Sequence, residues 1–117
     1  MSKPTPKALL RDLEKRDGKE CVWHGESCGT DVLVPQHRQG GMGGSKKKHR
    51  LSNVLWLCAL TNGLIEADAD LAEEARVRGI KISLHADPTV IPVLYPDGKR
   101  YYLDDFGGRE YVDSQPF

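Results

Sequence analysis

Leu51-Ser52-Asn53-Val54-Leu55-Trp56-Leu57-Cys58 is the stretch that decides the fold. Its last five residues are apolar without interruption, which predicts a buried strand over 54–58. Residues 61–78 follow almost at once and place Leu, Ile, Ala and Val at an approximate helical spacing, with Gly79 as a stop. The order predicts a strand that leads into one helix.

A second strand is predicted just upstream. Residues 31–35 (DVLVP) are apolar and β-branched, so a short strand should end at Pro35. Residues 36–50 then contain glycine at four of the five positions from 40 to 44, together with five Lys and Arg residues. Such a segment is too rich in glycine for a helix and too polar for a strand, so it must be a loop.

The flanking segments predict further elements. Leu9, Leu10 and Leu13 recur at helical spacing before Gly18, which predicts a helix over about 6–16. Residues 80–85 have the pattern of a strand. Asp97-Gly98 is a strong hairpin signal between apolar segments at 92–96 and 100–103, and the polar tail from 107 to 117 is expected to be loose.

Composition predicts one small α+β domain. The chain has 117 residues, 38% hydrophobic and 29% charged, which is typical of a globular protein and too short for a second domain. It contains neither a run of roughly 20 apolar residues nor a secretory signal pattern, so we expect no membrane contact and a cytoplasmic location. Its three cysteines, an odd number, favour metal binding or burial over disulfides.

Charge is distributed unevenly. Residues 1–60 carry eleven Lys and Arg against six Asp and Glu, and residues 61–117 carry the reverse, six against eleven. A basic half is compatible with nucleic-acid binding, although an ordinary mixed surface explains it equally well. The acidic residues along 66–74 are interpreted as the solvated face of the predicted helix.

Three polar residues flank the two central strands: His37 follows the first strand, Asn53 precedes the second, and Asn62 opens the helix. In this ordered set the sequence resembles the HNH endonuclease family, which has the ββα-metal fold. The resemblance rests on 35–38 (PQHR), 51–58 (LSNVLWLC) and 61–66 (TNGLIE), and the segments 40–45 and 75–80 are similar to small HNH proteins of actinobacterial bacteriophages. It implies a ββα core over about 20–79, a flanking N-terminal helix and C-terminal strands over about 80–105.

The resemblance also implies a function and a role for each residue. The family hydrolyses phosphodiester bonds of DNA, so His37 would be the general base that activates water. Asn53 would brace the loop that holds the histidine, and Asn62 would bind one divalent cation, Mg²⁺ or another. Histidine suits the first role because its pKa lies near neutrality. If the protein is encoded by a phage, it would act in the host cytoplasm.

Gln36 departs from the family pattern, which usually has a metal-binding Asp or His directly before the base. A glutamine carbonyl can coordinate Mg²⁺ but brings no charge, so we expect weak metal affinity and weak activity. The alternative is a catalytically degenerate module that keeps the fold and binds nucleic acid or a protein partner. The sequence leaves the target strand type and the oligomeric state open.

A second set of residues has the chemistry of a structural zinc site. Cys21 and His24 have the spacing of a zinc knuckle, and Cys28 and Cys58 complete a possible Cys₃His set. The family often joins its strands through zinc, although Thr61 here stands where a fourth cysteine would be. Three reduced cysteines without metal are the alternative.

The loop between the strands is the expected DNA-binding surface. Its glycines let the backbone approach phosphates, and its cationic side chains would contact them without reading the base sequence. The candidate contacts are Arg38, Lys46, Lys47, Lys48, His49 and Arg50.

Overall fold

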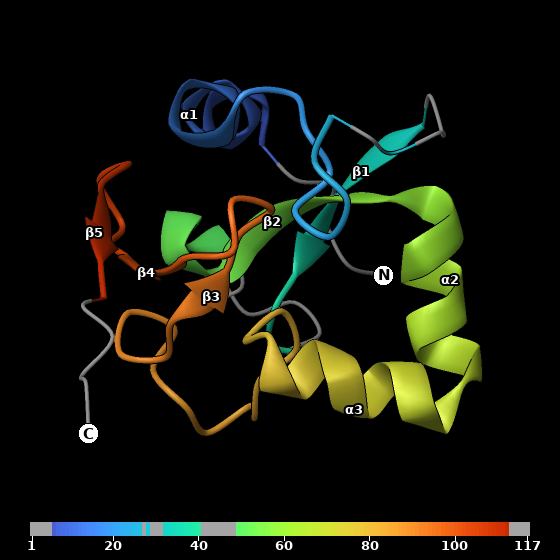
Figure 1. The fold of residues 1–117 in the computed structure, drawn as a ribbon. Coiled ribbons are helices and arrows are strands. Elements are labelled where there is room, and N and C mark those ends of the chain that lie inside the picture. Colours follow the sequence, from blue (N-terminus) through green and yellow to red (C-terminus); the bar gives the residue numbers. More distant parts are fainter. Residues whose placement is uncertain (1–5, 27, 29–31, 41–48, 113–117) are drawn as a thin grey trace.

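The structure, a computed structural model, describes residues 6–26, 28, 32–40 and 49–112. Over these ranges it is a mixed α+β fold with three α-helices and two small antiparallel sheets (Figure 1). The elements are α1 (Lys7–Asp17), β1 (Leu33–His37), the 3-10 helix η2 (Leu51–Asn53), β2 (Val54–Cys58), α2 (Ala59–Ala67), α3 (Ala69–Val77), β3 (Val93–Leu94), β4 (Arg100–Leu103) and β5 (Arg109–Tyr111). None of these helices has the length and apolarity needed to cross a bilayer.

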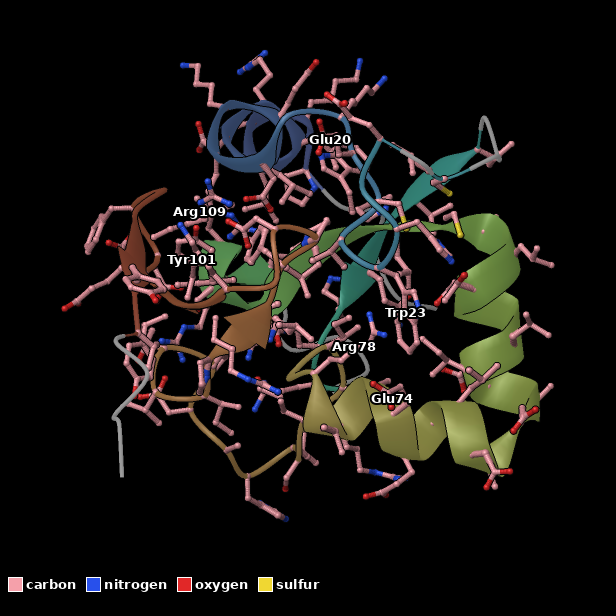
Figure 2. All side chains as sticks on the ribbon, viewed as in Figure 1. Glu20, Trp23, Glu74, Arg78, Tyr101 and Arg109 are labelled. Atoms are coloured by element: carbon pink, nitrogen blue, oxygen red, sulfur yellow. The ribbon has the colours of Figure 1, made fainter. Side chains whose placement is uncertain are left out.

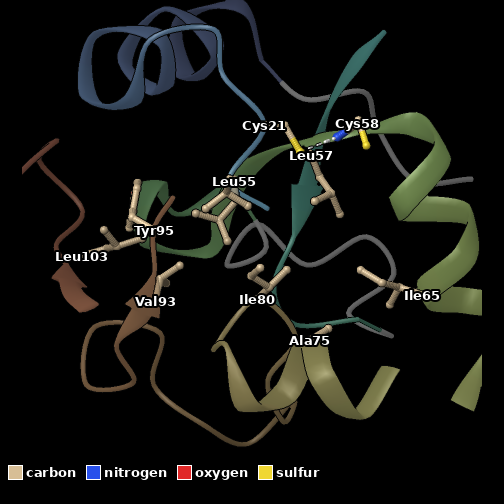
Figure 3. Close-up of a cluster of buried hydrophobic side chains, with 11 residues drawn as sticks. Cys21, Leu55, Leu57, Cys58, Ile65, Ala75, Ile80, Val93, Tyr95 and Leu103 are labelled. Atoms are coloured by element: carbon tan, nitrogen blue, oxygen red, sulfur yellow. Dashed lines mark hydrogen bonds between the residues drawn. The ribbon is translucent and has the colours of Figure 1, made fainter. Parts of the chain in front are cut away.

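Strand β2 divides the core into two clusters. All five of its residues are buried, as the uninterrupted apolar run predicts. Leu55 and Leu57 pack with α2, α3 and the C-terminal sheet (Figure 3), whereas Val54 and Trp56 pack against α1. This alternation follows from the two-residue period of a strand. One short segment therefore holds together the N-terminal helix and the rest of the fold.

Strand β1 runs antiparallel to β2, with Leu33 opposite Cys58 and His37 opposite Val54. The prediction that this strand ends at Pro35 is wrong. Proline is tolerated in an edge strand where its nitrogen faces the open edge, and the sheet of β1 and β2 has only two strands. His37 is therefore the last residue of a strand, and its backbone is placed by pairing with β2.

Helix α1 confirms the predicted N-terminal helix almost residue for residue. It ends at Gly18, whose φ of 67° is in the left-handed region that glycine adopts without strain. Leu13 and Arg16 are its buried residues. The Arg16 guanidinium donates to the carbonyls of Leu51 and Val54 at 2.8 and 2.7 Å, which anchors the helix on η2 and the start of β2.

The single helix predicted over 61–78 is in fact two helices, which meet at a corner in Figure 1. Asp68 causes the break: its backbone is extended, and its carboxylate accepts from the N–H groups of Asp70 and Leu71 at 2.9 and 3.3 Å. Aspartate competes with the helix by capping a new one. The corner turns α3 back beneath β1 and β2.

The C-terminal part confirms the hairpin and corrects two other predictions. β3 pairs with β4 around Asp97-Gly98, and Gly98 has a φ of 80°. Residues 80–85 do not form a strand; only Ile82 makes an isolated bridge, to Gln39. Part of the tail is ordered, because β5 adds a third strand alongside β4.

Candidate functional site

A cleft of about 440 Å³ lies where β1, the last turn of α2 and residues 80–82 meet. Its polar lining comes from Gln36, His37, Arg38, Glu66 and Lys81. Leu57, Ile65, Ile80 and Ile82 supply its apolar wall. The structure thus brings the expected base and Gln36 to one cleft, together with an acidic and a basic side chain that we did not predict there.

His37 is half-buried at the end of β1. Its Nε2 lies 3.4 Å from Nδ1 of His49, with the ring centroids 5.3 Å apart. The side-chain amide of Gln36 donates from Nε2 to the carbonyl of His37 at 3.3 Å. That bond uses the amide nitrogen, so the carbonyl oxygen of Gln36 is the atom that a cation would engage.

Asn53 is fully buried and bonds to the chain as it leaves β1. Its Oδ1 accepts from the backbone N–H of Gln39 at 3.0 Å, and its own carbonyl accepts from the N–H of Arg38 at 2.7 Å. These two bonds fix the residues directly after His37 against the start of β2. They are the contacts that a bracing residue requires.

Arg38 is not a DNA contact, which corrects our prediction. The residue has no exposed surface. Its guanidinium donates to four backbone carbonyls, those of Ser52 at 2.9 Å, Gly79 at 2.8 Å, Pro88 at 2.7 Å and Ile91 at 2.6 Å. Burial lowers its pKa to about 10, so the group stays charged at neutral pH. Arg38 organises the wall of the cleft instead of binding phosphate.

Of the other predicted DNA contacts in the loop, the structure describes Arg50 but not the three lysines. Lys46, Lys47 and Lys48 lie outside the described residues. Arg50 forms ion pairs with Asp105 at 2.8 Å and Asp87 at 3.5 Å, and these raise the pKa of its guanidinium, with the Asp105 hydrogen bond as the main cause. The charge of Arg50 is therefore already balanced within the protein.

Helix α2 carries Asn62 in its first half and Glu66 one turn later, on the same side of the helix. Asn62 is not among the described residues that line the cleft, whereas Glu66 is. Lys81 Nζ lies 4.0 Å from Glu66 Oε1 across the cleft. Glu66 is exposed, as the interpretation of a solvated acidic face predicts, and it also lines the cleft. In the sequence, its spacing of four residues from Asn62 is the signal that could place it near the site.

The cysteine set converges, although its members are far apart in sequence. The ligand atoms of Cys21, His24, Cys28 and Cys58 all lie within 4.8 Å of one another, and Cys21 and Cys58 are buried. His24 Nδ1 lies 3.5 Å from the sulfur of Cys21 and 3.9 Å from that of Cys58. Three thiols and one imidazole at this separation could hold a metal ion such as zinc.

The two buried thiols differ in acidity. Burial raises the pKa of Cys21, which also accepts from the backbone N–H of Cys58 at 3.4 Å (Figure 3). Burial acts in the same direction at Cys58, but hydrogen bonds with Thr61 outweigh it and lower the pKa. The hydroxyl of Thr61 lies 3.0 Å from the sulfur of Cys58, so the residue in place of a fourth cysteine contacts the cluster without being a ligand.

The cysteine knuckle is held against α3 by an aromatic contact (Figure 2). The guanidinium of Arg78 stacks over the ring of Trp23, 4.1 Å from its centroid, and Arg78 Nε donates to Glu74 at 2.8 Å. Trp23 thus has a packing role. The contact joins the knuckle that carries the potential metal cluster to the C-terminal end of α3.

Comparisons with known proteins do not assign the chain to a group. No family model, curated protein or solved structure matches it. Function must therefore be argued from the chemistry of the cleft and of the cysteine cluster.

Proposed function

We propose that this protein is a metal-dependent endonuclease of the HNH type, which hydrolyses phosphodiester bonds of DNA. The observation that carries the proposal is the cleft that joins His37, Gln36 and Glu66, with Asn53 bonded to the chain directly after His37. The succession β1, β2, α2 agrees with the ββα arrangement that the sequence resemblance implies.

His37 is the general base in this proposal. Imidazole can take a proton from water near neutral pH, and β1 pairing fixes where the ring stands. Asn53 acts indirectly, because its two bonds to residues 38 and 39 hold the backbone that follows the ring. Precise placement matters since the attacking water must lie in line with the bond that breaks.

Glu66 is the residue that makes a cation site plausible. Carboxylate and amide oxygens are the ligands that Mg²⁺ prefers, and the carboxylate of Glu66 faces the same cleft as the amide of Gln36. Asn62, one turn earlier on α2, would add a third oxygen from the same side of the helix. A bound cation would stabilise negative charge on the phosphate and on the leaving oxygen. Glu66 supplies the negative charge that Gln36 and Asn62 lack.

DNA binding would use the cleft and the basic loop together. Among the described residues that line the cleft, Lys81 is the cationic side chain with exposed surface. With Lys46, Lys47 and Lys48 from the loop, it would contact phosphates, so binding should weaken steeply with salt. The described residues of the cleft offer no base-reading element, and we propose no sequence preference.

Zinc would be the structural metal of the cysteine cluster, held by Cys21, His24, Cys28 and Cys58. The cluster joins the knuckle at 21–28 to the end of β2, immediately before α2 begins. A small core gains folding free energy directly from such a metal. In this proposal zinc fixes the direction of α2 and thereby the position of Glu66.

Nicking of supercoiled plasmid tests the proposal. Chelators would remove zinc as well as the catalytic cation, so zinc-loaded protein should be assayed with and without added Mg²⁺. We expect cleavage only with Mg²⁺, and loss of cleavage in His37→Ala but not in His85→Ala, an exposed histidine outside the cleft. Equal cleavage by the wild type and His37→Ala would refute the role of His37. Salt-sensitive DNA binding without any cleavage would favour the degenerate binding module.

A further inference from the structure

A second histidine lies against the residue proposed as the base. His49 Nδ1 is 3.4 Å from His37 Nε2, and the ring planes are inclined by 52°. His49 is half-buried at the end of the loop, where the chain returns to η2 and β2. The separation is long for a hydrogen bond but within reach, and such bonds often tighten only when substrate is bound.

We propose that His49 is a positioning residue for His37, which it holds by accepting a hydrogen bond from Nε2–H. The proposal rests on the assignment of His37 as the base. A neutral imidazole has one N–H and one lone pair, so donation from Nε2 places the lone pair of His37 on Nδ1. A partner at one ring nitrogen thereby selects the tautomer and the orientation of the ring.

The bond would strengthen during the reaction. The O–H bond of the attacking water breaks, its electron pair stays on the oxygen that attacks phosphorus, and the proton bonds to Nδ1 of His37. As the new P–O bond forms, the P–O bond to the leaving oxygen breaks and its electron pair departs with that oxygen. The ring is then an imidazolium, and its Nε2–H bond to His49 becomes a charge-assisted one. His49 therefore stabilises the charged form of the base without contacting the substrate.

This role differs from the DNA contact that the sequence suggests for His49. A histidine that accepts through Nδ1 carries its proton on Nε2 and is neutral, so it offers little attraction to a phosphate. Of the described cationic residues, Arg38 bonds to backbone carbonyls, Arg50 pairs with Asp105 and Lys81 lies near Glu66. Loss of His49 should thus change kcat and leave DNA affinity unchanged.

Nitrogen NMR of the imidazole rings tests the contact directly, whether or not the protein cuts DNA. We expect the Nε2–H tautomer for His37 in the wild type and a mixture of tautomers in His49→Ala. The Asn side chain places an oxygen near the position of Nδ1 and the Gln side chain places one near Nε2. His49→Asn should therefore restore the tautomer, and His49→Gln should not. His85→Ala is the matched control and should leave the signals of His37 unchanged.

Cleavage kinetics provide the second readout. His49→Ala should lower kcat by about 10- to 100-fold at unchanged KM, with partial recovery in His49→Asn. If His49→Ala fails to fold, the comparison of His49→Asn with His49→Gln tests the hydrogen bond instead. An Nδ1–H tautomer of His37 in the wild type, or a rise in KM alone, would overturn the proposal. If no variant cuts DNA but the tautomers behave as expected, the contact stands and the nuclease assignment falls.

Discussion

The side-chain oxygen of Asn53 accepts a hydrogen bond from the backbone N–H of Gln39 at 3.0 Å, and both residues are buried. Gln39 in turn donates its side-chain amide to the carbonyls of Ser83, Leu84 and Ala86. Asn53 therefore connects the start of β2, through one intermediate residue, to the segment 83–86 that directly follows the cleft residues 80–82. The position of His37 depends on this connection.

Asn53→Ala should lower the free energy of unfolding by about 1–3 kcal/mol, because the N–H of Gln39 would remain buried without its acceptor. Denaturant unfolding measures the change. The same substitution at Asn62, which is half-buried on α2, should cost less than about 0.5 kcal/mol. Similar losses at both positions would contradict a special role for Asn53.

Arg38→Met should lower the free energy of unfolding by more than about 3 kcal/mol, since it leaves four carbonyls without their donor. Arg38→Lys should also be strongly destabilised, because one ammonium cannot reach the same set of acceptors. Arg100→Met is the control: Arg100 donates to one exposed carbonyl, that of Val77. If Arg38→Lys unfolds at the same denaturant concentration as the wild type, the four hydrogen bonds of Arg38 do not contribute to stability as proposed.

Asp105 should make stability depend on pH in the acid range. Burial acts to raise the pKa of its carboxyl, but hydrogen bonds with Ser52 and Arg50 outweigh it and lower the pKa. The unfolded chain then binds the proton at higher pH than the folded one. The stabilisation is complete above about pH 4 and is lost as the pH falls through the folded pKa.

Asp105→Asn should accordingly lower the free energy of unfolding at pH 7 and change it less at about pH 2–3. Urea unfolding across this range provides the measurement. Glu110→Gln, an exposed substitution on β5, should leave the loss of stability at acid pH as in the wild type. A deficit for Asp105→Asn that is equally large at both pH values would show that the lost interaction is not the carboxylate.

Zinc should bind once per chain and stabilise the fold. At free zinc about 1,000 times the dissociation constant the gain is about 4 kcal/mol, seen as a higher midpoint of thermal unfolding. Cobalt in place of zinc should give the absorption of a tetrahedral thiolate site. Cys58→Ser should weaken both responses, whereas His85→Ala should keep them. If neither zinc nor a chelator changes the thermal midpoint of the wild type, the proposal of a structural zinc site is refuted.

Glu66→Gln should raise the Mg²⁺ concentration needed for half-maximal cleavage at least about tenfold, because it removes the carboxylate from the cleft. Glu73→Gln is the matched control, since Glu73 is an exposed acid on α3. The measurement is nicking rate against Mg²⁺ concentration. Identical curves for the two variants would show that the carboxylate of Glu66 does not bind the cation and is only part of a solvated acidic face.

The elements that sequence predicts well are those with strong local signals. The apolar run of β2, the leucine spacing of α1 and the Asp97-Gly98 turn each need no information from distant residues, and each is confirmed. Asp68 is the opposite case: within an otherwise helical pattern its capping tendency breaks the helix. Residues 80–85 have strand composition, yet only Ile82 forms a bridge.

The candidate site is less accessible to sequence because it is assembled from distant segments. The cysteine set could be named from its spacing, and the structure brings it together. Arg38 and Glu66 could not be placed: a guanidinium bonded only to backbone carbonyls leaves no signature in the acceptors' side chains. The part that Glu66 takes depends on the angle at which α2 leaves β2.

The guanidinium of Arg38 reaches carbonyls that are 14 to 53 residues further along the chain. During synthesis on the ribosome, the last of these acceptors emerges well after β1 and β2. Until residue 91 has left the ribosome the guanidinium of Arg38 must stay hydrated or incompletely bonded, so the wall beside His37 can form only late in folding.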